Sequence, residues 1–254
     1  MIFPGHNRTK PTLAIDKFSL NVKAREFLVI VGPSGCGKST ILAMSAGLVK
    51  PTAGKVFLGQ ELVGRPGPDK AVVFQNLSLF PWKTVVGNIE FGLRLNGIEA
   101  AERCRRIDYY VPMMGLKGFE HHYPTQLSGG MQQRVAIARS LVLRPRLLLM
   151  DEPFAALDAQ NRTLMQEELV RVWSEHKQTV IFVTHSVEEA VFLADRVVVM
   201  TRRPGRIKEV IDVGGIAGAK HWRATPFGEA MQRSDFQSLR HRVWELIRDE
   251  IVTK

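Results

Sequence analysis

The sequence predicts an α/β fold in which a mostly parallel sheet is flanked by helices. Two patterns support this prediction. Short apolar runs alternate with helical segments in the second half of the chain, and residues 27–31 (FLVIV) are continuously apolar, as in a strand buried on both faces. With 45% hydrophobic and 24% charged residues, the composition is typical of a globular protein and excludes a disordered, collagen-like or coiled-coil chain. The 254 residues suit one large domain, or a core domain with a subdomain.

The first half opens with a strand, a loop and a helix. The buried strand at 27–31 leads into a glycine-rich loop at 32–37. A helix is predicted from Lys38 to about Gly47, where a glycine can end it. Further short strands are predicted at 56–58 and 71–74.

The pattern changes between about residues 76 and 130. Glycines and prolines interrupt the sequence here, and helices are predicted at 84–95 and 99–114. We interpret this stretch as an inserted helical subdomain. A further helix at 131–143 leads back towards the core.

Strands and helices then alternate to residue 200. Such alternation is typical of βαβ units, which build a parallel sheet covered by helices. A glycine-rich linker at 213–219 precedes an amphipathic helix at the end of the chain. The strands are predicted at 147–150, 179–183 and 197–200, and the helices at 159–176 and 186–194.

Composition narrows the function classes only partly. No apolar run approaches the length of a membrane-spanning helix, and the N-terminus lacks the apolar stretch of a secretory signal. The two cysteines, Cys36 and Cys104, form no CxxC pair, so we expect neither a disulfide framework nor a structural zinc site. The formal net charge of +10 fits a basic solvated surface, but also a nucleic-acid or acidic-membrane partner.

A glycine-rich loop with a lysine occupies residues 32–39 (GPSGCGKS), which match the pattern GxxxxGK[ST]. Its glycines let the backbone wrap closely around an anion, and the following helix N-terminus adds partial positive charge. Lys38 can neutralise nucleotide phosphates, and the Ser39 hydroxyl can bind Mg²⁺. The alternative is a glycine-rich turn that binds no nucleotide. The loop alone leaves kinases, GTPases and motor proteins open.

Two adjacent carboxylates follow the apolar run at 147–150 (LLLM). Ligands of open α/β sheets bind at the carboxyl ends of the strands. Asp151 is therefore expected to hold Mg²⁺, and Glu152 to orient or deprotonate an attacking water. The alternative is that the two acids cap the next helix.

A third motif occupies residues 127–134 (LSGGMQQR). Ser128 is a favourable helix N-cap, and Gly129 and Gly130 would leave the first backbone N–H groups bare. A helix interior would disfavour these glycines, since each costs about 1 kcal/mol relative to alanine. We therefore expect a second phosphate-binding site. Two copies placed head-to-tail would complete both half-sites, and two-fold pairing is the commonest oligomer geometry.

With these three motifs in this order, the sequence resembles the ATP-binding subunits of ABC transporters over roughly residues 3–212. The resemblance implies a P-loop NTPase core with a mostly parallel sheet, an antiparallel β portion and an inserted helical subdomain. In that organisation a single ABC ATPase domain spans the chain. Its core comprises residues 1–75 and 131–212, its helical subdomain 76–130, and its C-terminal tail 213–254.

The resemblance also implies roles for individual residues, with ATP and Mg²⁺ as cofactors. Glu152 matches the catalytic base, and His185 the histidine that holds the γ-phosphate. Asp151, Ser39 and Gln75 match the Mg²⁺ ligands, and Gln75 also senses the membrane partner. The nucleotide contacts expected within one chain are Gly32, Pro33, Ser34, Gly35, Cys36, Gly37, Lys38, Ser39, Thr40 and Phe3. The contacts expected across the dimer are Ser128, Gly129, Gly130 and Gln132, together with the Asp158 loop.

Some of these residues have simpler alternatives. An ordinary surface amide is the alternative for Gln75, and a structural histidine for His185. Cys36 is interpreted as a small filler of the loop rather than a redox switch. Phe3 would stack on adenine. Family members usually have an edge strand before this aromatic residue, but here almost nothing precedes it. Either that strand is missing or the start codon is set too late. A disordered Phe3 is the alternative.

Smaller motifs favour one branch of the family. Residues 79–82 (LFPW), 86–89 (VGNI) and 203–207 (RPGRI) resemble the ATPases of nitrate, sulfonate, taurine and bicarbonate importers. Residues 76–92 would then lie where the ATPase meets the coupling helix of the permease. Trp82 is expected either in that contact or in the core.

The resemblance therefore implies an ATPase that energises import of a small anionic solute. It would work as a homodimer, or paired with a similar ATPase, on two transmembrane permease subunits at the cytoplasmic face of the inner membrane. An extracytoplasmic solute-binding protein would take part indirectly. The alternatives are the ATPase of an exporter and a soluble ABC-type ATPase that acts on nucleic acid, which is the less expected partner.

Overall fold

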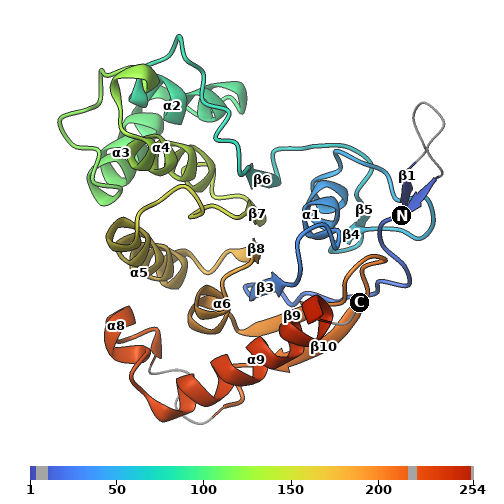
Figure 1. Cartoon of the computed structure of the whole chain (residues 1–254). Coiled ribbons are helices and arrows are strands. Elements are labelled where there is room, and N and C mark those ends of the chain that lie inside the picture. The colour runs from blue at the N-terminus through green and yellow to red at the C-terminus, as the bar shows by residue number, and fades with distance from the viewer. Residues whose placement is uncertain (4–10, 217–221, 253–254) are drawn as a thin grey trace. The chain divides into compact units, whose positions relative to one another are not determined.

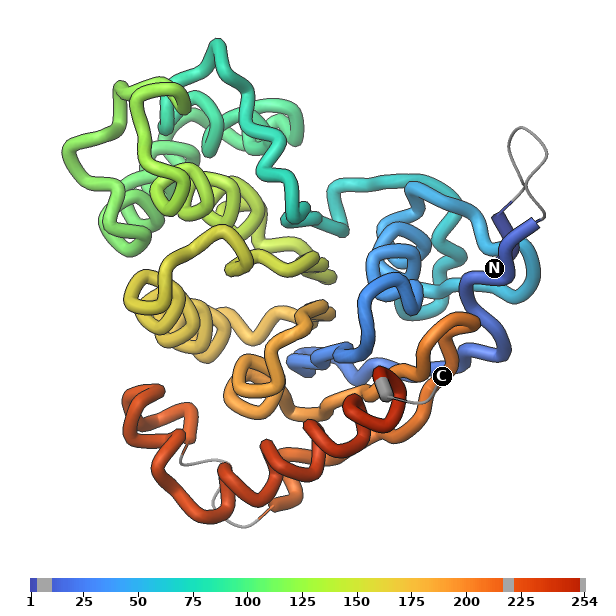
Figure 2. Tube along the Cα trace, viewed as in Figure 1, coloured from blue at the N-terminus to red at the C-terminus, as the bar shows by residue number. Residues whose placement is uncertain are grey.

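The computed structural model describes residues 1–3, 11–216 and 222–252 (Figure 1). The chain forms two compact units, the first from residues 1–67 and 179–254 and the second from residues 68–178. Figure 2 shows the chain leaving the first unit and returning to it after the second is complete. Among the described residues, no helix is both long enough and apolar enough to cross a bilayer.

The main sheet of the first unit has the strand order β10-β9-β3-β8. β3 (Phe27–Val31) is parallel to β8 (Thr179–Thr184) and to β9 (Arg196–Met200), whereas β10 (Ile207–Asp212) is antiparallel to β9. All five residues of β3 are fully buried, as the continuous apolar run predicts. β3 is thus a central strand, and its carboxyl end is fixed on both sides.

Helices cover this sheet. α6 (Val187–Leu193) packs against β3 and β8, and α9 (Ser234–Val252) packs against α6 and β9. Figure 1 shows both on one face of the sheet and α1 (Lys38–Ala46) on the other. α9 is amphipathic as predicted: of its regularly spaced apolar residues, Phe236, Leu239, Val243 and Ile247 are buried and Leu246 is half-buried. The other elements found among the described residues of this unit are β1 (Ile2–Phe3), β2 (Thr12–Leu13), β4 (Phe57–Leu58), β5 (Glu61–Leu62) and α8 (Phe227–Ala230).

The second unit contains a parallel pair, β6 (Lys70–Val73) and β7 (Leu147–Asp151), and a set of helices. α2 packs against α3 and α4, and α4 packs against β6. Three of the helices begin at side chains that accept a hydrogen bond from the first turn, namely Thr84, Ser128 and Asp158. The helices are α2 (Val85–Leu95), α3 (Ala100–Met113), the 3₁₀ turn η1 (Pro124–Gln126), α4 (Gly129–Leu141) and α5 (Ala159–His176).

The predicted α/β class is confirmed, and so is the antiparallel portion, which consists of the β1–β2 and β4–β5 pairs together with β10. The elements that the sequence did not predict are β1, β2, β5, η1, β10 and α8. The helical subdomain expected at 76–130 stays a prediction, because α2 and α3 belong to a unit that also holds β6, β7 and α5.

The N-terminal segment forms a two-stranded antiparallel sheet from β1 and β2. Phe3 lies in β1, pairs with Thr12 and is 38% exposed, so its ring is on the surface. Pro4 and Gly5, the rest of the expected aromatic turn, lie outside the described residues. Phe3 as the adenine contact remains a prediction.

Candidate functional site

The glycine-rich loop of the first unit has a backbone that requires glycine. Gly35 and Gly37 have φ values of 75° and 104°, in the region that L side chains rarely adopt. A Cβ on Gly37 would also lie 2.8 Å from Cγ1 of Ile15. Gly37 is the N-cap of α1, so this conformation directs the N-terminus of the helix towards the loop.

Lys38 is held inside this loop. Its side chain is buried, and its ammonium donates to the carbonyl oxygens of Gly32 and Pro33 at 2.7 and 3.0 Å. The positive charge is therefore fixed within the turn rather than extended into solvent. This is the arrangement expected of a loop built to receive an anion.

Cys36 is fully buried in the same loop. Burial raises the pKa of its thiol, and the nearby Lys38 charge only partly offsets the effect. Because the thiolate is the reactive form, a raised pKa makes this cysteine less reactive. The interpretation as a small filler agrees with these observations.

His185 directly follows the end of β8, beside the strand that leads into the glycine-rich loop. Val31 pairs with Thr184, so Gly32 and His185 follow the paired ends of neighbouring parallel strands. His185 is exposed, and hydrogen bonds hold the residues on either side of it, Thr184 and Ser186. The Thr184 hydroxyl donates to the carboxylate of Glu189 at 2.5 Å, and its oxygen accepts from the Ser186 N–H at 3.0 Å.

The second unit presents its carboxylates at the end of β7. Val73 pairs with Met150, so Gln75 and Asp151 emerge at the same edge of neighbouring parallel strands. Gln75 is exposed, and Asp151 and Glu152 are half-buried. Glu152 has a φ of 45°, which is strained for a residue with a side chain. Strain of this kind costs about 1–3 kcal/mol and clusters at functional positions.

The third motif forms the start of α4. The Ser128 hydroxyl oxygen accepts a hydrogen bond from the Met131 N–H at 3.3 Å, so Ser128 is the predicted N-cap. A Cβ on Gly129 would meet nothing within 4 Å, whereas one on Gly130 would touch Leu157 at 3.3 Å. One side of this helix N-terminus is therefore open space, and the other packs against the loop before α5.

Gln132 and Asp158 both engage their own chain. The Gln132 amide donates to the carbonyl oxygens of Pro124 and Leu127 at 3.0 and 3.2 Å. Asp158 accepts from the backbone and side chain of Asn161, and these hydrogen bonds lower the pKa of its carboxyl group. Within one chain these residues fix the segments on either side of Ser128 and α5. Their contacts across a dimer remain predictions.

Two arginines have contacts that the sequence did not reveal. Arg139, in the last turn of α4, donates to the carbonyls of Ser78 and Leu77 at 2.8 and 2.9 Å, and so holds the segment that follows Gln75. Arg203 donates to the carbonyl of Gly35 in the glycine-rich loop. Both contacts join residues far apart in the chain, which periodicity and short motifs cannot detect.

The donor atoms fit Mg²⁺ better than a softer metal. Ser39, Gln75 and Asp151 offer a hydroxyl, an amide carbonyl and a carboxylate, all hard oxygen ligands. Within the described residues, no group of three or more His, Cys, Asp and Glu side chains could hold a metal.

Comparison with known proteins agrees with these motifs. A family model described as ABC transporter matches residues 15–155, more than half of the chain. An uncharacterized ABC transporter ATP-binding protein of Methanocaldococcus jannaschii, MJ0412, is 56% identical over 207 residues, which cover 82% of this chain and 76% of that protein.

Two relatives have names that include a solute. The nitrate import ATP-binding protein NrtD of Synechocystis is 47% identical over 201 residues, covering 79% of this chain and 76% of that protein. The taurine import ATP-binding protein TauB of Yersinia pestis is 46% identical over 196 residues, covering 77% of each chain.

Solved structures have the same fold. The dimeric structure of MJ0796, described as a bacterial ABC transporter cassette, is 32% identical and superposes with a TM-score of 0.75. The match covers 85% of this chain and 96% of that one. A second MJ0796 structure, a post-hydrolysis state bound to ADP and phosphate, gives a TM-score of 0.74 at the same identity and coverage.

Proposed function

Because the chain belongs to the ABC transporter family, as an ATPase that hydrolyses ATP to ADP and phosphate, we propose that it energises import of a small oxyanion-bearing solute. The observation that carries the chemistry is the buried Lys38 inside a loop whose glycines adopt positive φ. The direction of transport rests on the NrtD and TauB relatives, whose names specify import of nitrate and of taurine.

We propose a separate role in ATP hydrolysis for each of the site residues. The glycine-rich loop and Lys38 bind the triphosphate, and Ser39, Gln75 and Asp151 would hold Mg²⁺, which supplies charge neutralisation at the phosphates. Glu152 orients the attacking water and accepts its proton. His185 holds the γ-phosphate and helps to orient the same water.

We propose that two copies work as a head-to-tail dimer. The N-terminus of α4 has an exposed Ser128 and open space at Gly129. The first N–H groups of a helix have no acceptor within the helix, and this end of the helix carries partial positive charge. A phosphate of the nucleotide held by a second copy would fill this space. The dimeric MJ0796 cassette supports this assembly.

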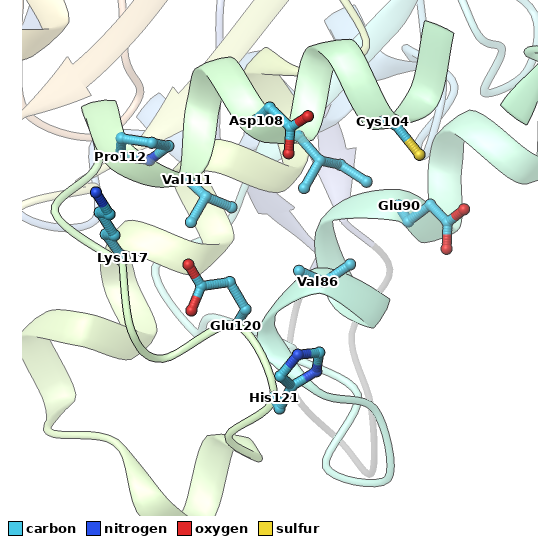
Figure 3. A pocket seen from close by; sticks show the side chains of 10 residues that line it. Val86, Glu90, Cys104, Asp108, Val111, Pro112, Lys117, Glu120 and His121 are labelled. Carbon is cyan, nitrogen blue, oxygen red and sulfur yellow. The ribbon is translucent and has the colours of Figure 1, made fainter. Parts of the chain in front are cut away.

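We propose that the permease binds to the second unit. A cavity of about 450 Å³ lies between α2, α3 and the segment at 117–121 (Figure 3). Apolar side chains of Val86, Ile107 and Val111 line it, and charged side chains surround them. We propose that a short amphipathic helix of the permease inserts here. The ATPase would then be a peripheral protein at the cytoplasmic face of the membrane, with a solute-binding protein taking part indirectly.

A pull-down from detergent-solubilised native membranes, followed by mass spectrometry, tests this function. A tagged wild-type chain should recover a polytopic permease and a solute-binding protein. Val86→Arg, in the cavity, should lose the permease while keeping ATPase activity in isolation. Leu62→Arg, at a position in the first unit that is 59% exposed, is the matched control and should retain the permease.

The other outcomes separate the alternatives. Recovery of a permease without a solute-binding protein would favour an exporter. Recovery of nucleic acid alone, with salt-sensitive binding, would overturn the transport proposal and leave the ATPase chemistry intact.

A further inference from the structure

The turn between β9 and β10, residues 201–206, touches the glycine-rich loop from outside. A Cβ on Gly205 would lie only 2.0 Å from the carbonyl oxygen of Cys36, so glycine is required at this contact. The Gly205 N–H donates to the Ala14 carbonyl at 2.8 Å, and its carbonyl accepts from the Asp16 N–H at 3.1 Å. In the sequence, residues 203–207 (RPGRI), which overlap this turn, indicate only a resemblance to one branch of the family. The proposed roles in ATP hydrolysis include no residue of this turn.

Arg203 carries the contact to the loop itself. Its Nε and Nη2 atoms donate to the carbonyl oxygen of Gly35 at 3.3 and 3.2 Å. At the other end of the same peptide, the Cys36 N–H donates to the Pro33 carbonyl at 3.3 Å. Both polar ends of the Gly35–Cys36 peptide are thereby engaged, which fixes the plane of that peptide next to the left-handed Gly35.

The turn is rigid enough to act as a support. The Thr201 hydroxyl donates to the Pro204 carbonyl at 3.2 Å and accepts from the Arg206 N–H at 3.0 Å. The Arg202 N–H donates to Glu250 of α9 at 3.1 Å. Together with the backbone hydrogen bonds that join Gly205 to Ala14 and Asp16, this contact holds the backbone from which Arg203 extends at two separate parts of the first unit.

Arg203 also brings a positive charge to the outside of the loop. A guanidinium bonded to the Gly35 carbonyl polarises that peptide and makes the potential at an anion bound by the same loop more positive. Hydrogen bonds to charged groups are stronger than neutral ones. The pair of contacts therefore has two effects on a phosphate ligand, one geometric and one electrostatic.

We propose that Arg203 is a positioning residue for nucleotide binding, which holds the Gly35–Cys36 peptide of the phosphate loop in the orientation that receives the triphosphate. The inference rests on the proposed function only in taking a nucleotide as the ligand. It predicts that the loss of Arg203 weakens ATP binding and raises KM, whereas kcat stays close to that of wild type.

The test is calorimetric titration of the full-length chain with ATP, together with ATPase kinetics and melting of the nucleotide-free protein. Arg203→Ala should weaken ATP binding about five- to tenfold, the size expected when charge-assisted hydrogen bonds at an exposed position are lost. The melting temperature should stay that of wild type. Arg203→Lys, which keeps a charged donor, should recover most of the affinity.

Arg206→Ala is the matched control, because Arg206 lies in the same turn, is exposed and bonds Asp16 instead of the loop. It should bind ATP like wild type. Wild-type affinity in Arg203→Ala, an equal loss in Arg206→Ala or no recovery in Arg203→Lys would each overturn the inference while wild type still binds ATP. A wild-type chain that binds no ATP would instead overturn the proposed function, and this inference with it.

Discussion

Two helix N-termini of this molecule differ in how their surroundings are built, and we propose that both receive phosphate. At α1 the loop encloses its own lysine, and Gly37 is pressed against Ile15. At α4 the cap residue Ser128 is exposed and Gly129 faces open space. On the proposed function, the first surface binds nucleotide alone, whereas the second receives a ligand brought by another copy. Binding and turnover should therefore respond differently to changes in the two regions.

The largest effect is expected at the open N-terminus. Ser128→Arg should reduce ATPase activity below detection, because a long cationic side chain fills the space that a partner's nucleotide would use. ATP affinity of the monomer should stay within about twofold, a difference below 0.5 kcal/mol. Steady-state phosphate release and calorimetric titration measure the two quantities.

Thr125→Arg is the control for this prediction, since Thr125 is also exposed and precedes α4. It should keep its activity. If the Ser128 variant lost monomer binding as well, the contrast between a complete and an incomplete site would be wrong.

The next effect separates chemistry from binding. Glu152→Gln should slow turnover by about 10²–10⁴, which is the usual contribution of a positioned base. It should still bind ATP, and it should elute as a dimer on a sizing column with ATP present. Turnover close to that of wild type would remove Glu152 from its assigned role.

A pair of glycine substitutions compares the two regions by stability. Gly37→Ala should lower the free energy of unfolding by about 1–3 kcal/mol, because the residue has a φ of 104° and no room for a Cβ. Gly129→Ala should be neutral or stabilising by up to about 1 kcal/mol, since it adds a methyl group to open space in a helix. Urea unfolding of both variants measures the difference. Equal losses would contradict it.

The smallest effect concerns the two thiols. With limiting iodoacetamide at pH 8, Cys104, which is exposed, should be alkylated at least about tenfold faster than Cys36. Cys36 is buried and has a raised pKa, so less of it is thiolate at any pH near neutrality. Peptide mass spectrometry over time resolves the two sites. Faster labelling of Cys36 would mean that the loop opens far more than the structure shows.

Local patterns predicted most of the fold. The continuous apolar run at 27–31 became the buried β3, and Ser128 became the N-cap of α4. Long-range contacts were beyond such patterns, as Arg203 and Gly35 are separated by 168 positions and Arg139 and Ser78 by 61. The positive φ of Glu152 is also not predictable from the sequence, because a glutamate, unlike a glycine, gives no signal of a left-handed backbone. The resemblance assigns Gln132 to a partner's nucleotide, which stays a prediction. Within its own chain, the Gln132 amide donates to the Pro124 carbonyl.

The position of β3 between β8 and β9 has a consequence for synthesis on the ribosome. Thr179, the first residue of β8, is made about 150 residues after Val31, so roughly 7–30 s pass at ordinary elongation rates. During this interval a fully apolar strand has neither of its neighbours. The nascent glycine-rich loop then has no sheet to hold it, and the whole second unit has been made before the first can close. A chaperone that shields short apolar segments would act on this chain in that interval.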